Sequence, residues 1–369
     1  MKSMWMFIFL LLPLLAIAYV GWHVWTLVPL SRIWRAVILT IGILSFLLIF
    51  LNFGRVIDRM PISLARLCYD VGNSTIFILL YLVIIFLVLD LGRLFRLVPR
   101  GWLCQNVYTT IIITLGIFVL FLLANINYHH KVRKELTITT QKPLTKPIKL
   151  VMLSDLHLGY HNPKQELHRW VELINNESPD YVLIAGDIID MSMRPLIEEN
   201  MAEEFRRIKA PVYACLGNHE YYSGEPQAQQ FYHDAGIRLL RDTCEASGDL
   251  CLIGRDDRAN PHRKSLGKLM AEANAQFPAL SSKFSVLLDH QPYYLEQAEK
   301  AGIDFQLSGH THHGQVWPIS WITDRIYECS HGEYQRGNTH YYVSSGIGIW
   351  GGKFRIGTKS EYVVATIKN

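Results

Sequence analysis

Residues 149–157 read KLVMLSDLH, a short apolar run that ends in a polar cluster with an aspartate and a histidine two positions apart. The arrangement returns at 181–187, YVLIAGD, and at 211–219, PVYACLGNH. Short, nearly continuous apolar runs are typical of strands that are buried on both faces of a sheet. Between the first two runs, residues 163–175 carry apolar side chains at helical spacing. This alternation predicts a layered α/β fold.

Two later apolar runs also end in polar clusters. They are 284–288, followed by Asp289-His290, and 304–307, followed by Ser308-Gly309-His310. In layered α/β folds, ligands bind at the carboxyl ends of the strands. The five clusters, although far apart in the sequence, are therefore expected to converge on one site.

The clusters are rich in side chains that bind divalent metals. They are D-x-H at Asp155 and His157, G-D-x-x-D at Asp187 and Asp190, G-N-H-E at Asn218, His219 and Glu220, a histidine at 290, and G-H-x-H at His310 and His312. Carboxylate and imidazole ligands suit manganese, iron and zinc. In an extended segment, residues two apart share a face, so D-x-H and H-x-H can each direct two ligands to one centre. Thiolates are absent from the clusters, so a structural zinc site is not expected.

Present in this order, the five blocks resemble the motifs of the calcineurin-like metallophosphoesterases, and the resemblance covers about residues 147–369. It implies a four-layer α/β/β/α sandwich that binds two divalent metal ions. The first ion is implied to be held by Asp155, His157, Asp187 and His312. The second is implied to be held by Asp187, Asn218, His290 and His310. Asp187 bridges the two ions because a carboxylate has two oxygens, whereas an amide or an imidazole serves one ion.

The same resemblance implies a reaction. A hydroxide that bridges the two metal ions would attack a phosphodiester or pyrophosphate bond. His219 resembles the family's non-ligand histidine beside the leaving group and is expected to donate a proton. Asp190 is expected to orient the site and Glu220 to support His219, although either side chain could simply be solvated. Arg255 and His313 are candidates for substrate contact, with ordinary surface positions as the alternative.

The first third of the chain has a different composition. Only 18% of all residues are charged, against about 25% in an ordinary soluble domain, and residues 1–127 are very poor in charge. Four apolar runs lie there, each near the roughly 20 residues that a helix needs to cross a bilayer: 3–25, 36–53, 74–91 and 109–127. We expect a transmembrane region with four helices at 1–128, a linker at 129–146 and a metallophosphoesterase domain at 147–369. This organisation resembles a bacterial membrane-bound branch of the family, related to the transmembrane protein with metallophosphoesterase domain.

Lysines and arginines in short loops predict the side of the membrane on which each loop lies. With four helices, both ends of the chain share a side with the loop between the second and third helices. That side holds Lys2, Arg55, Arg59, Arg66, Lys131, Arg133 and Lys134. The other side holds Arg32, Arg35, Arg93, Arg96 and Arg100. The excess on the first side favours a cytoplasmic catalytic domain at the inner membrane of a bacterium.

An enzyme held among membrane lipids gains most when its substrate lies in the same membrane, so a lipid-linked phosphate is expected. Some members of this branch resemble enzymes that split UDP-2,3-diacylglucosamine in lipid A biosynthesis, which makes this compound the specific candidate. The alternatives are a phosphodiesterase for a soluble substrate and a membrane sensor or structural module with a phosphoesterase-like domain. A net charge of +4 does not support a nucleic-acid partner.

Overall fold

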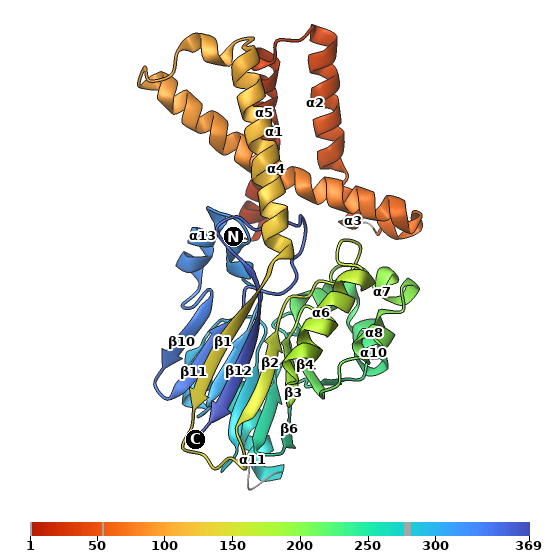
Figure 1. Cartoon of the computed structure of the whole chain (residues 1–369), viewed down its shortest axis with the longest axis vertical. Coiled ribbons are helices and arrows are strands. Elements are labelled where there is room, and N and C mark those ends of the chain that lie inside the picture. The colour runs from red at the N-terminus through yellow and green to blue at the C-terminus, as the bar shows by residue number, and fades with distance from the viewer. Residues whose placement is uncertain (1, 54, 277–281) are drawn as a thin grey trace. The chain divides into compact units, whose positions relative to one another are not determined.

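The computed structural model describes residues 2–53, 55–276 and 282–369, and the side chains of residues 11–52 and of the described residues from 55 onward. The chain divides into two units, whose elements are labelled in Figure 1. The helical unit is Met1–Ile126 with Gly351–Lys353, and the sheet unit is Asn127–Trp350 with Phe354–Asn369.

The helical unit is built from apolar helices. They are α1 (Lys2–Leu27), α2 (Arg32–Leu47), α3 (Phe50–Phe53), α4 (Ile62–Leu94) and α5 (Val107–His129), with short 3-10 turns at Ile57–Arg59 and Arg100–Leu103. Three segments are long and apolar enough to cross a membrane: Arg32–Asn52, Ile62–Leu94 and Val107–His129. The chain is therefore a membrane protein.

The expected fourth span, at 3–25, lies within α1. The part of α1 whose side chains are described forms an apolar segment at Leu11–Leu27, which is too short to qualify as a span by itself. We predicted four membrane spans, whereas the described residues show three. The expected span at 74–91 is also shorter than α4, because α4 begins at Ile62 and buries Cys68 and Tyr69 in its first turns.

One acidic side chain joins α1 to α4 inside the helical unit. Asp90 accepts a hydrogen bond of 2.8 Å from the Tyr19 hydroxyl, and its carboxylate lies 2.9 Å from Nε2 of His23. Arg93, one turn along α4, lies 3.3 Å from the same carboxylate. A charge in an apolar surrounding is costly unless it is paired, so these contacts explain how α4 tolerates Asp90.

The sheet unit contains two six-stranded sheets. The first has the order β1-β12-β2-β3-β4-β5, from β1 (Lys131–Thr139), β12 (Ser360–Lys368), β2 (Ile148–Leu153), β3 (Tyr181–Ala185), β4 (Val212–Cys215) and β5 (Ile237–Leu239). The second has the order β10-β11-β9-β8-β7-β6, from β10 (Gly332–Arg336), β11 (Thr339–Val343), β9 (Phe305–Ser308), β8 (Phe284–Leu288), β7 (Leu250–Gly254) and β6 (Thr243–Ser247). Strands β2 to β5 run parallel in one sheet, and β7, β8 and β9 run parallel in the other.

Three apolar cores separate the layers of the sheet unit. Between the sheets, side chains such as Leu150 and Leu183 from the first meet Val286 and Phe305 from the second. The outer face of the first sheet is covered by α6 (Lys164–Glu177), α7 (Arg194–Glu198), α8 (Met201–Phe205) and α10 (Glu225–Asp234), as Figure 1 shows. The outer face of the second is covered by α11 (Leu266–Gln276) and α12 (Glu296–Lys300). The predicted α/β/β/α sandwich is therefore confirmed.

The segment 129–146, which we expected to be a linker, contains the whole of an edge strand. Helix α5 ends at His129 and β1 begins at Lys131, and β1 pairs in parallel with β12 over nine residues. In β1 only Leu136 and Ile138 are buried, so its apolar content was too low to indicate a strand. As a result, a single residue, His130, separates the membrane helix from the first sheet.

Candidate metal centre

The five polar clusters lie at the carboxyl ends of β2, β3, β4, β8 and β9, as their spacing after apolar runs predicted. Because β2, β3 and β4 are parallel neighbours in one sheet and β8 and β9 in the other, their ends can meet across the sandwich. The third cluster opens α9 (Asn218–Ser223), and the fifth leads into a 3-10 turn, η4 (His312–Gly314).

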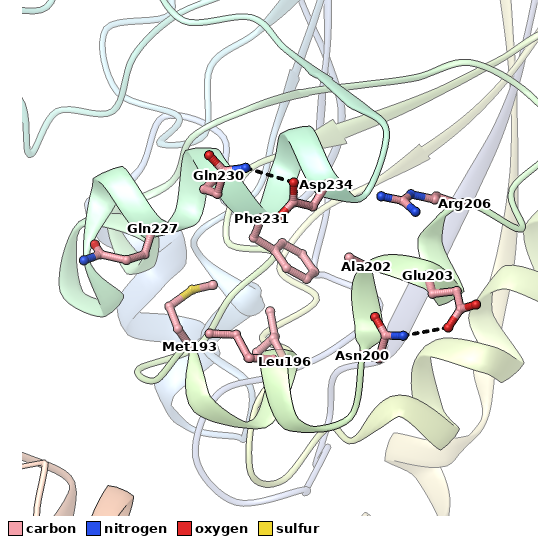
Figure 2. Close-up of a pocket in the computed structure, with 11 residues that line it drawn as sticks. Met193, Leu196, Asn200, Ala202, Glu203, Arg206, Gln227, Gln230, Phe231 and Asp234 are labelled. Carbon is pink, nitrogen blue, oxygen red and sulfur yellow. Dashed lines mark hydrogen bonds between the residues drawn. The ribbon is translucent and has the colours of Figure 1, made fainter.

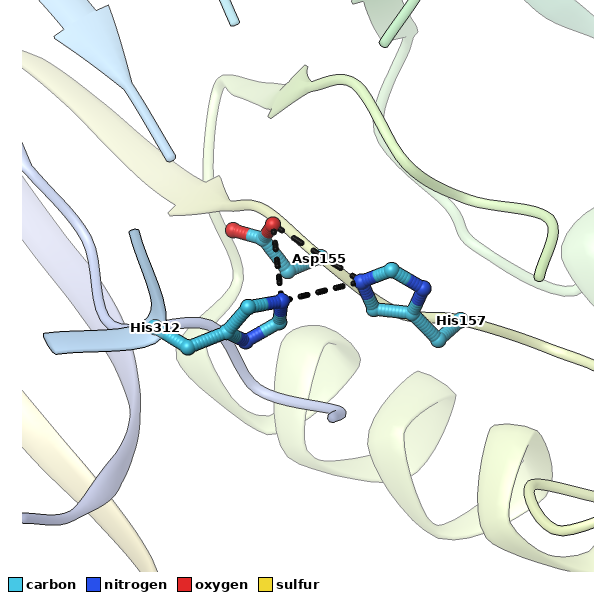
Figure 3. A group of neighbouring side chains, drawn as sticks. All are labelled: Asp155, His157 and His312. Carbon is cyan, nitrogen blue, oxygen red and sulfur yellow. Dashed lines mark hydrogen bonds and ion pairs between the residues drawn. The ribbon is translucent and has the colours of Figure 1, made fainter. Parts of the chain in front are cut away.

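One group of side chains joins the first and the last cluster. Figure 3 shows Asp155 and His157 facing His312, and the Nε2 atoms of the two histidines are 3.1 Å apart. Oδ1 of Asp155 lies 3.8 Å from Nε2 of His157 and 3.5 Å from Nε2 of His312. All three residues are buried, and their ligand atoms are close enough to share one metal ion.

Asp187 connects this group to a second. Its Oδ2 lies 3.7 Å from Nε2 of His157 and 3.0 Å from Nε2 of His290. Asp187, His290 and His310 form another group whose ligand atoms lie within 4.8 Å of one another. A carboxylate at this position can serve two ions, which is the geometry expected of a bridging ligand.

Asn218 supplies a separate indication that a cation fits here. It is the first residue of α9 and is 8% exposed, and its Oδ1 has no hydrogen-bond partner among the described residues. A buried oxygen without a donor is costly, because it loses its hydrogen bonds to water. A metal ion beside Asp187 would satisfy it. The donor set of carboxylates, imidazoles and one amide suits manganese, iron or zinc.

The ligand-type residues have an uncommon backbone conformation. The φ angles are +54° at Asp155, +45° at His157, +51° at Asp187, +70° at His310 and +49° at His312. Positive φ is unfavourable for residues other than glycine and persists only where the surrounding structure enforces it, often at functional sites. This backbone conformation directs each side chain away from the end of its strand and toward the shared centre.

Three side chains next to the ligand groups were expected to assist the chemistry. His219 is partly exposed, with Nδ1 3.2 Å from the backbone oxygen of Asp190 and 3.4 Å from its Oδ1. The same carboxylate lies 3.3 Å from Nδ1 of His157, so Asp190 contacts two imidazoles at once. His219 also belongs to a group of metal-ligand type with His157 and Asp187.

Glu220, expected to support His219, faces elsewhere. Its carboxylate is fully buried and accepts hydrogen bonds from the backbone nitrogens of Asp187 at 3.1 Å, Ile189 at 3.0 Å and Gly217 at 2.7 Å. It therefore fastens the loop after β3 to the loop after β4. Burial, followed by the nearby charge of Asp187, raises the pKa of Glu220.

Burial and neighbouring charges shift the pKa values of the histidines in opposite directions. Burial opposes a positive charge on His157, but hydrogen bonds to Asp155 and Asp190 outweigh it and raise its pKa to about 10. The pKa of His290 is also raised well above its usual value, since Asp187 outweighs the effect of burial. Burial, together with the charge of His290, lowers the pKa of His310 to about 4, and burial also lowers that of His312.

The two residues proposed from the sequence as substrate contacts have other partners. Arg255 is only 8% exposed, and its Nη1 lies 3.0 Å from Oδ2 of Asp289. A guanidinium held in the interior by Asp289 is not free to grip a substrate phosphate. His313 stacks on the ring of His331 at 4.6 Å.

An arginine outside the five clusters supports the ligand loop. Arg355 is buried, and its Nη1 donates to the backbone oxygen of His312 at 2.6 Å. Its other amino group donates to backbone oxygens of Ser345 and Gly348. Arg355 thus positions the His312 segment instead of facing a substrate.

The rim of the centre carries aromatic side chains and a cation that lie outside the five sequence clusters. The Tyr222 ring lies 5.2 Å from that of His219, and the Tyr327 ring lies 6.3 Å from that of His310. Tyr327 is hydrogen-bonded through its hydroxyl to Tyr293 at 3.0 Å. The exposed Arg258 lies over the Tyr293 ring at 4.7 Å. These residues come from segments far apart in the sequence, so no local pattern could join them.

A pocket elsewhere in the sheet unit has a different character. It lies between α7, α8 and α10 and is lined by residues such as Met193, Leu196 and Phe231 (Figure 2). None of the ligand-type residues described above lines it. This pocket is therefore separate from the cluster of ligand-type residues at the strand ends.

Comparison with known proteins agrees with the fold and the clusters. The family model of the calcineurin-like phosphoesterases matches residues 148–314. An uncharacterized metallophosphoesterase of Campylobacter jejuni is 32% identical over 265 residues, which are 70% of this chain and 68% of that protein. One from Helicobacter pylori is 32% identical over 220 residues, and the chain spans only 59% of its length.

A vertebrate protein matches over nearly the whole chain. The transmembrane protein with metallophosphoesterase domain of Danio rerio is 28% identical over 368 residues, which are 92% of this chain and 81% of that protein. With the matched family model and the relative from Campylobacter jejuni, the assignment is clear. The chain belongs to the calcineurin-like metallophosphoesterases, a family of metal-dependent phosphoester hydrolases.

Proposed function

We propose that the chain hydrolyses a phosphodiester or pyrophosphate bond at a centre of two divalent metal ions. Asp155, His157, Asp187 and His312 would hold one ion, and Asp187, Asn218, His290 and His310 would hold the other. The observation that carries the proposal is the sharing of Asp187 between two overlapping groups of buried and half-buried ligand-type side chains. Two such ions supply a water that is nucleophilic at neutral pH and positive charge for the phosphate oxygens.

His219 is our candidate for the general acid. It is a half-buried imidazole beside the cluster, with its side chain 12% exposed, and Nδ1 faces Asp190. The Asp190 carboxylate would hold the ring in one orientation and leave Nε2 to donate a proton to the departing oxygen. Asp190 would act as a positioning residue for both His219 and His157.

Two substitutions separate metal binding from proton transfer. Asn218→Ala should lower the metal content of the purified full-length protein as well as its turnover of bis(p-nitrophenyl) phosphate with manganese. His219→Ala should leave metal content unchanged and reduce kcat by about 10²- to 10⁴-fold. His233→Ala, at a histidine on α10 whose side chain is 85% exposed, is the matched control and should behave as wild type. Wild-type turnover by Asn218→Ala and His219→Ala would exclude catalysis at this centre.

We further propose that the substrate is lipid-linked, with a pyrophosphate such as that of UDP-2,3-diacylglucosamine as the specific candidate. The membrane helices support this, since they would anchor the enzyme in the membrane that holds such a substrate. Arg258 also supports it, because an exposed cation on the rim can bind a second phosphate group of the substrate. Arg258→Ala should then raise KM for a pyrophosphate more than for a simple diester.

A substrate panel tests this choice. Detergent-purified full-length protein, with manganese, would be given lipid-linked pyrophosphates and soluble diesters in parallel. Faster turnover of a lipid substrate supports the proposal. Turnover of soluble diesters alone would leave the phosphoesterase function intact but would replace the lipid substrate with a soluble one.

The side of the membrane remains a proposal as well. We propose that the sheet unit faces the cytoplasm of a bacterial cell, on the basis of the lysine and arginine excess described above, which counts α1 as a fourth span. In a protein whose exposed Cys104 is replaced by serine (Cys104→Ser), a cysteine placed at the exposed Lys368 (Lys368→Cys) should react with a membrane-impermeant maleimide only after cells are opened. Labelling in intact spheroplasts would show that the sheet unit lies on the opposite side of the membrane.

A further inference from the structure

A short helix in the sheet unit presents an apolar face to solvent. Helix α13 (Ile319–Ile326) exposes 64% of Trp321, 56% of Ile322 and 58% of Ile326. With 3.6 residues per turn, these three side chains and Arg325 project from one side of the helix, and Trp317 just before it is 37% exposed. We call Trp317, Trp321, Ile322, Arg325 and Ile326 the α13 face.

The concentration of these side chains sets them apart from ordinary surface. Single exposed hydrophobic residues are normal on any protein. The large exposed hydrophobic residues of the described sheet unit are Ile197, Tyr222, Tyr294, Trp317, Trp321, Ile322, Ile326 and Trp350. Half of them fall within ten consecutive positions, and the Trp317 and Trp321 rings contact each other at 5.3 Å. Contiguous apolar surface of this kind marks an interaction site.

Contacts inside the sheet unit place the α13 face near the end of the membrane helix α5. The backbone nitrogen of Trp317 donates to the oxygen of Ile356 at 2.7 Å. Asn127, in the last turn of α5, donates through Nδ2 to the oxygens of Arg355 at 2.7 Å and Thr358 at 3.0 Å. One short segment, 355–358, therefore contacts both the end of α5 and the beginning of the α13 face.

The end of a membrane-spanning helix is where the membrane meets water. Helix α5 qualifies as a span, and only His130 separates it from β1, so the sheet unit begins directly at the end of this span. Tryptophan favours this interfacial region, because its ring is apolar and its N–H is polar. Arginine beside it can pair with lipid phosphates while its stem lies along apolar surface.

We propose that the α13 face is a membrane-docking surface, which inserts into the headgroup region of the bilayer that α5 spans. The apolar side chains would then contact lipid instead of water, and Arg325 would contact a lipid phosphate. The apolar side chains are Trp317, Trp321, Ile322 and Ile326. The occupant is the bilayer surface, not a second protein. Since η4, which carries His312, lies only a few residues before α13, docking would hold the rim of the metal centre at the lipid surface. The proposal requires no catalysis and stands apart from the proposed function.

Site-specific photo-crosslinking tests the docking surface in the full-length protein. Trp321→p-benzoylphenylalanine, reconstituted into vesicles of phosphatidylethanolamine and phosphatidylglycerol, should form lipid adducts on illumination. The matched control is Lys368→p-benzoylphenylalanine, which lies at the far end of β12, paired with Thr139 at the end of β1 away from α5. We expect at least about tenfold more lipid adduct at 321 than at 368, since insertion of an apolar helix face puts its side chains among acyl chains.

The other outcomes contradict the proposal. Equal lipid adducts at the two positions would show that the α13 face does not meet the bilayer. Adducts to a second copy, to another protein or to the chain's own helices would assign the face to a protein contact instead. If the change at Trp321 prevents folding, as judged by metal content, Ile326→p-benzoylphenylalanine provides the same measurement.

Discussion

At the scale of single residues, the centre depends on positions where only glycine fits. A Cβ placed on Gly217 would lie 2.2 Å from Oδ1 of Asp187, and one on Gly309 would lie 2.3 Å from Oδ2 of Asp155. Both carboxylates are ligand-type groups, so the glycines after the strands are needed for close approach as well as for turning.

Gly217→Ala is therefore expected to displace the Asp187 carboxylate and to weaken metal binding. Changes next to metal ligands typically lower affinity by about 10- to 100-fold. Manganese titration of the purified protein by calorimetry measures the effect. Gly267→Ala, in α11, is the control, because an added Cβ meets nothing within 4 Å there. Wild-type affinity for Gly217→Ala would show that Asp187 is not a ligand.

The histidine pKa values predict proton release on metal binding. Without metal, the raised pKa values of His157, about 10, and of His290 mean that both are protonated at pH 7, whereas His310, at about 4, and His312 are neutral. A metal ion binds only the unprotonated ring nitrogen, so these protons must leave. Affinity should rise with pH, since protons compete less as pH increases. Calorimetry at pH 7 in buffers of different ionisation enthalpy should detect release of about two protons; no buffer dependence would contradict the assignment.

At the scale of elements, one carboxylate joins two strand ends. Glu220 on α9 accepts three backbone hydrogen bonds from the loops after β3 and β4. Glu220→Ala would leave three N–H groups without this acceptor, at a cost of about 1–3 kcal/mol for each that stays buried. A fall in the Tm of the detergent-purified protein is expected. Glu198→Ala, which removes an exposed ion pair with Arg194 on α7, should change it little. Equal Tm values for the two variants would contradict this role.

Elements also show how far sequence patterns reach. The strands β2, β3, β4, β8 and β9 were predictable, because buried strands are nearly continuous apolar runs and each ends in a distinctive polar cluster. Edge strand β1 was missed, since only Leu136 and Ile138 are buried in it. The partners of Glu220 and Arg255 were also missed, because both depend on loops that meet only after folding. Local spacing predicts which residues gather, but not which atoms they face.

At the scale of the whole molecule, the direct passage from α5 into β1 has a mechanical consequence. Because only His130 lies between them, the end of the membrane helix and the start of the first strand are joined by only a few ångströms of chain. All of the ligand-type residues lie in the sheet unit, so a soluble substrate has no need of this connection. The proposed lipid-linked substrate, by contrast, would benefit from a direct connection between the membrane helix and the sheet unit.

Inserting ten glycine and serine residues after His130 should therefore separate the two substrate classes. Such a linker has an average span of about 18 Å, enough to let the sheet unit leave the surface. In vesicles, we expect turnover of a lipid-linked pyrophosphate to fall by about tenfold, because effective concentration drops as a tether lengthens. Turnover of bis(p-nitrophenyl) phosphate should stay unchanged. The same insertion at Gly248, in the turn between β6 and β7, preserves the tether and should spare both activities. Undiminished lipid turnover with the linker after His130 would show that the close connection plays no part in reaching the substrate.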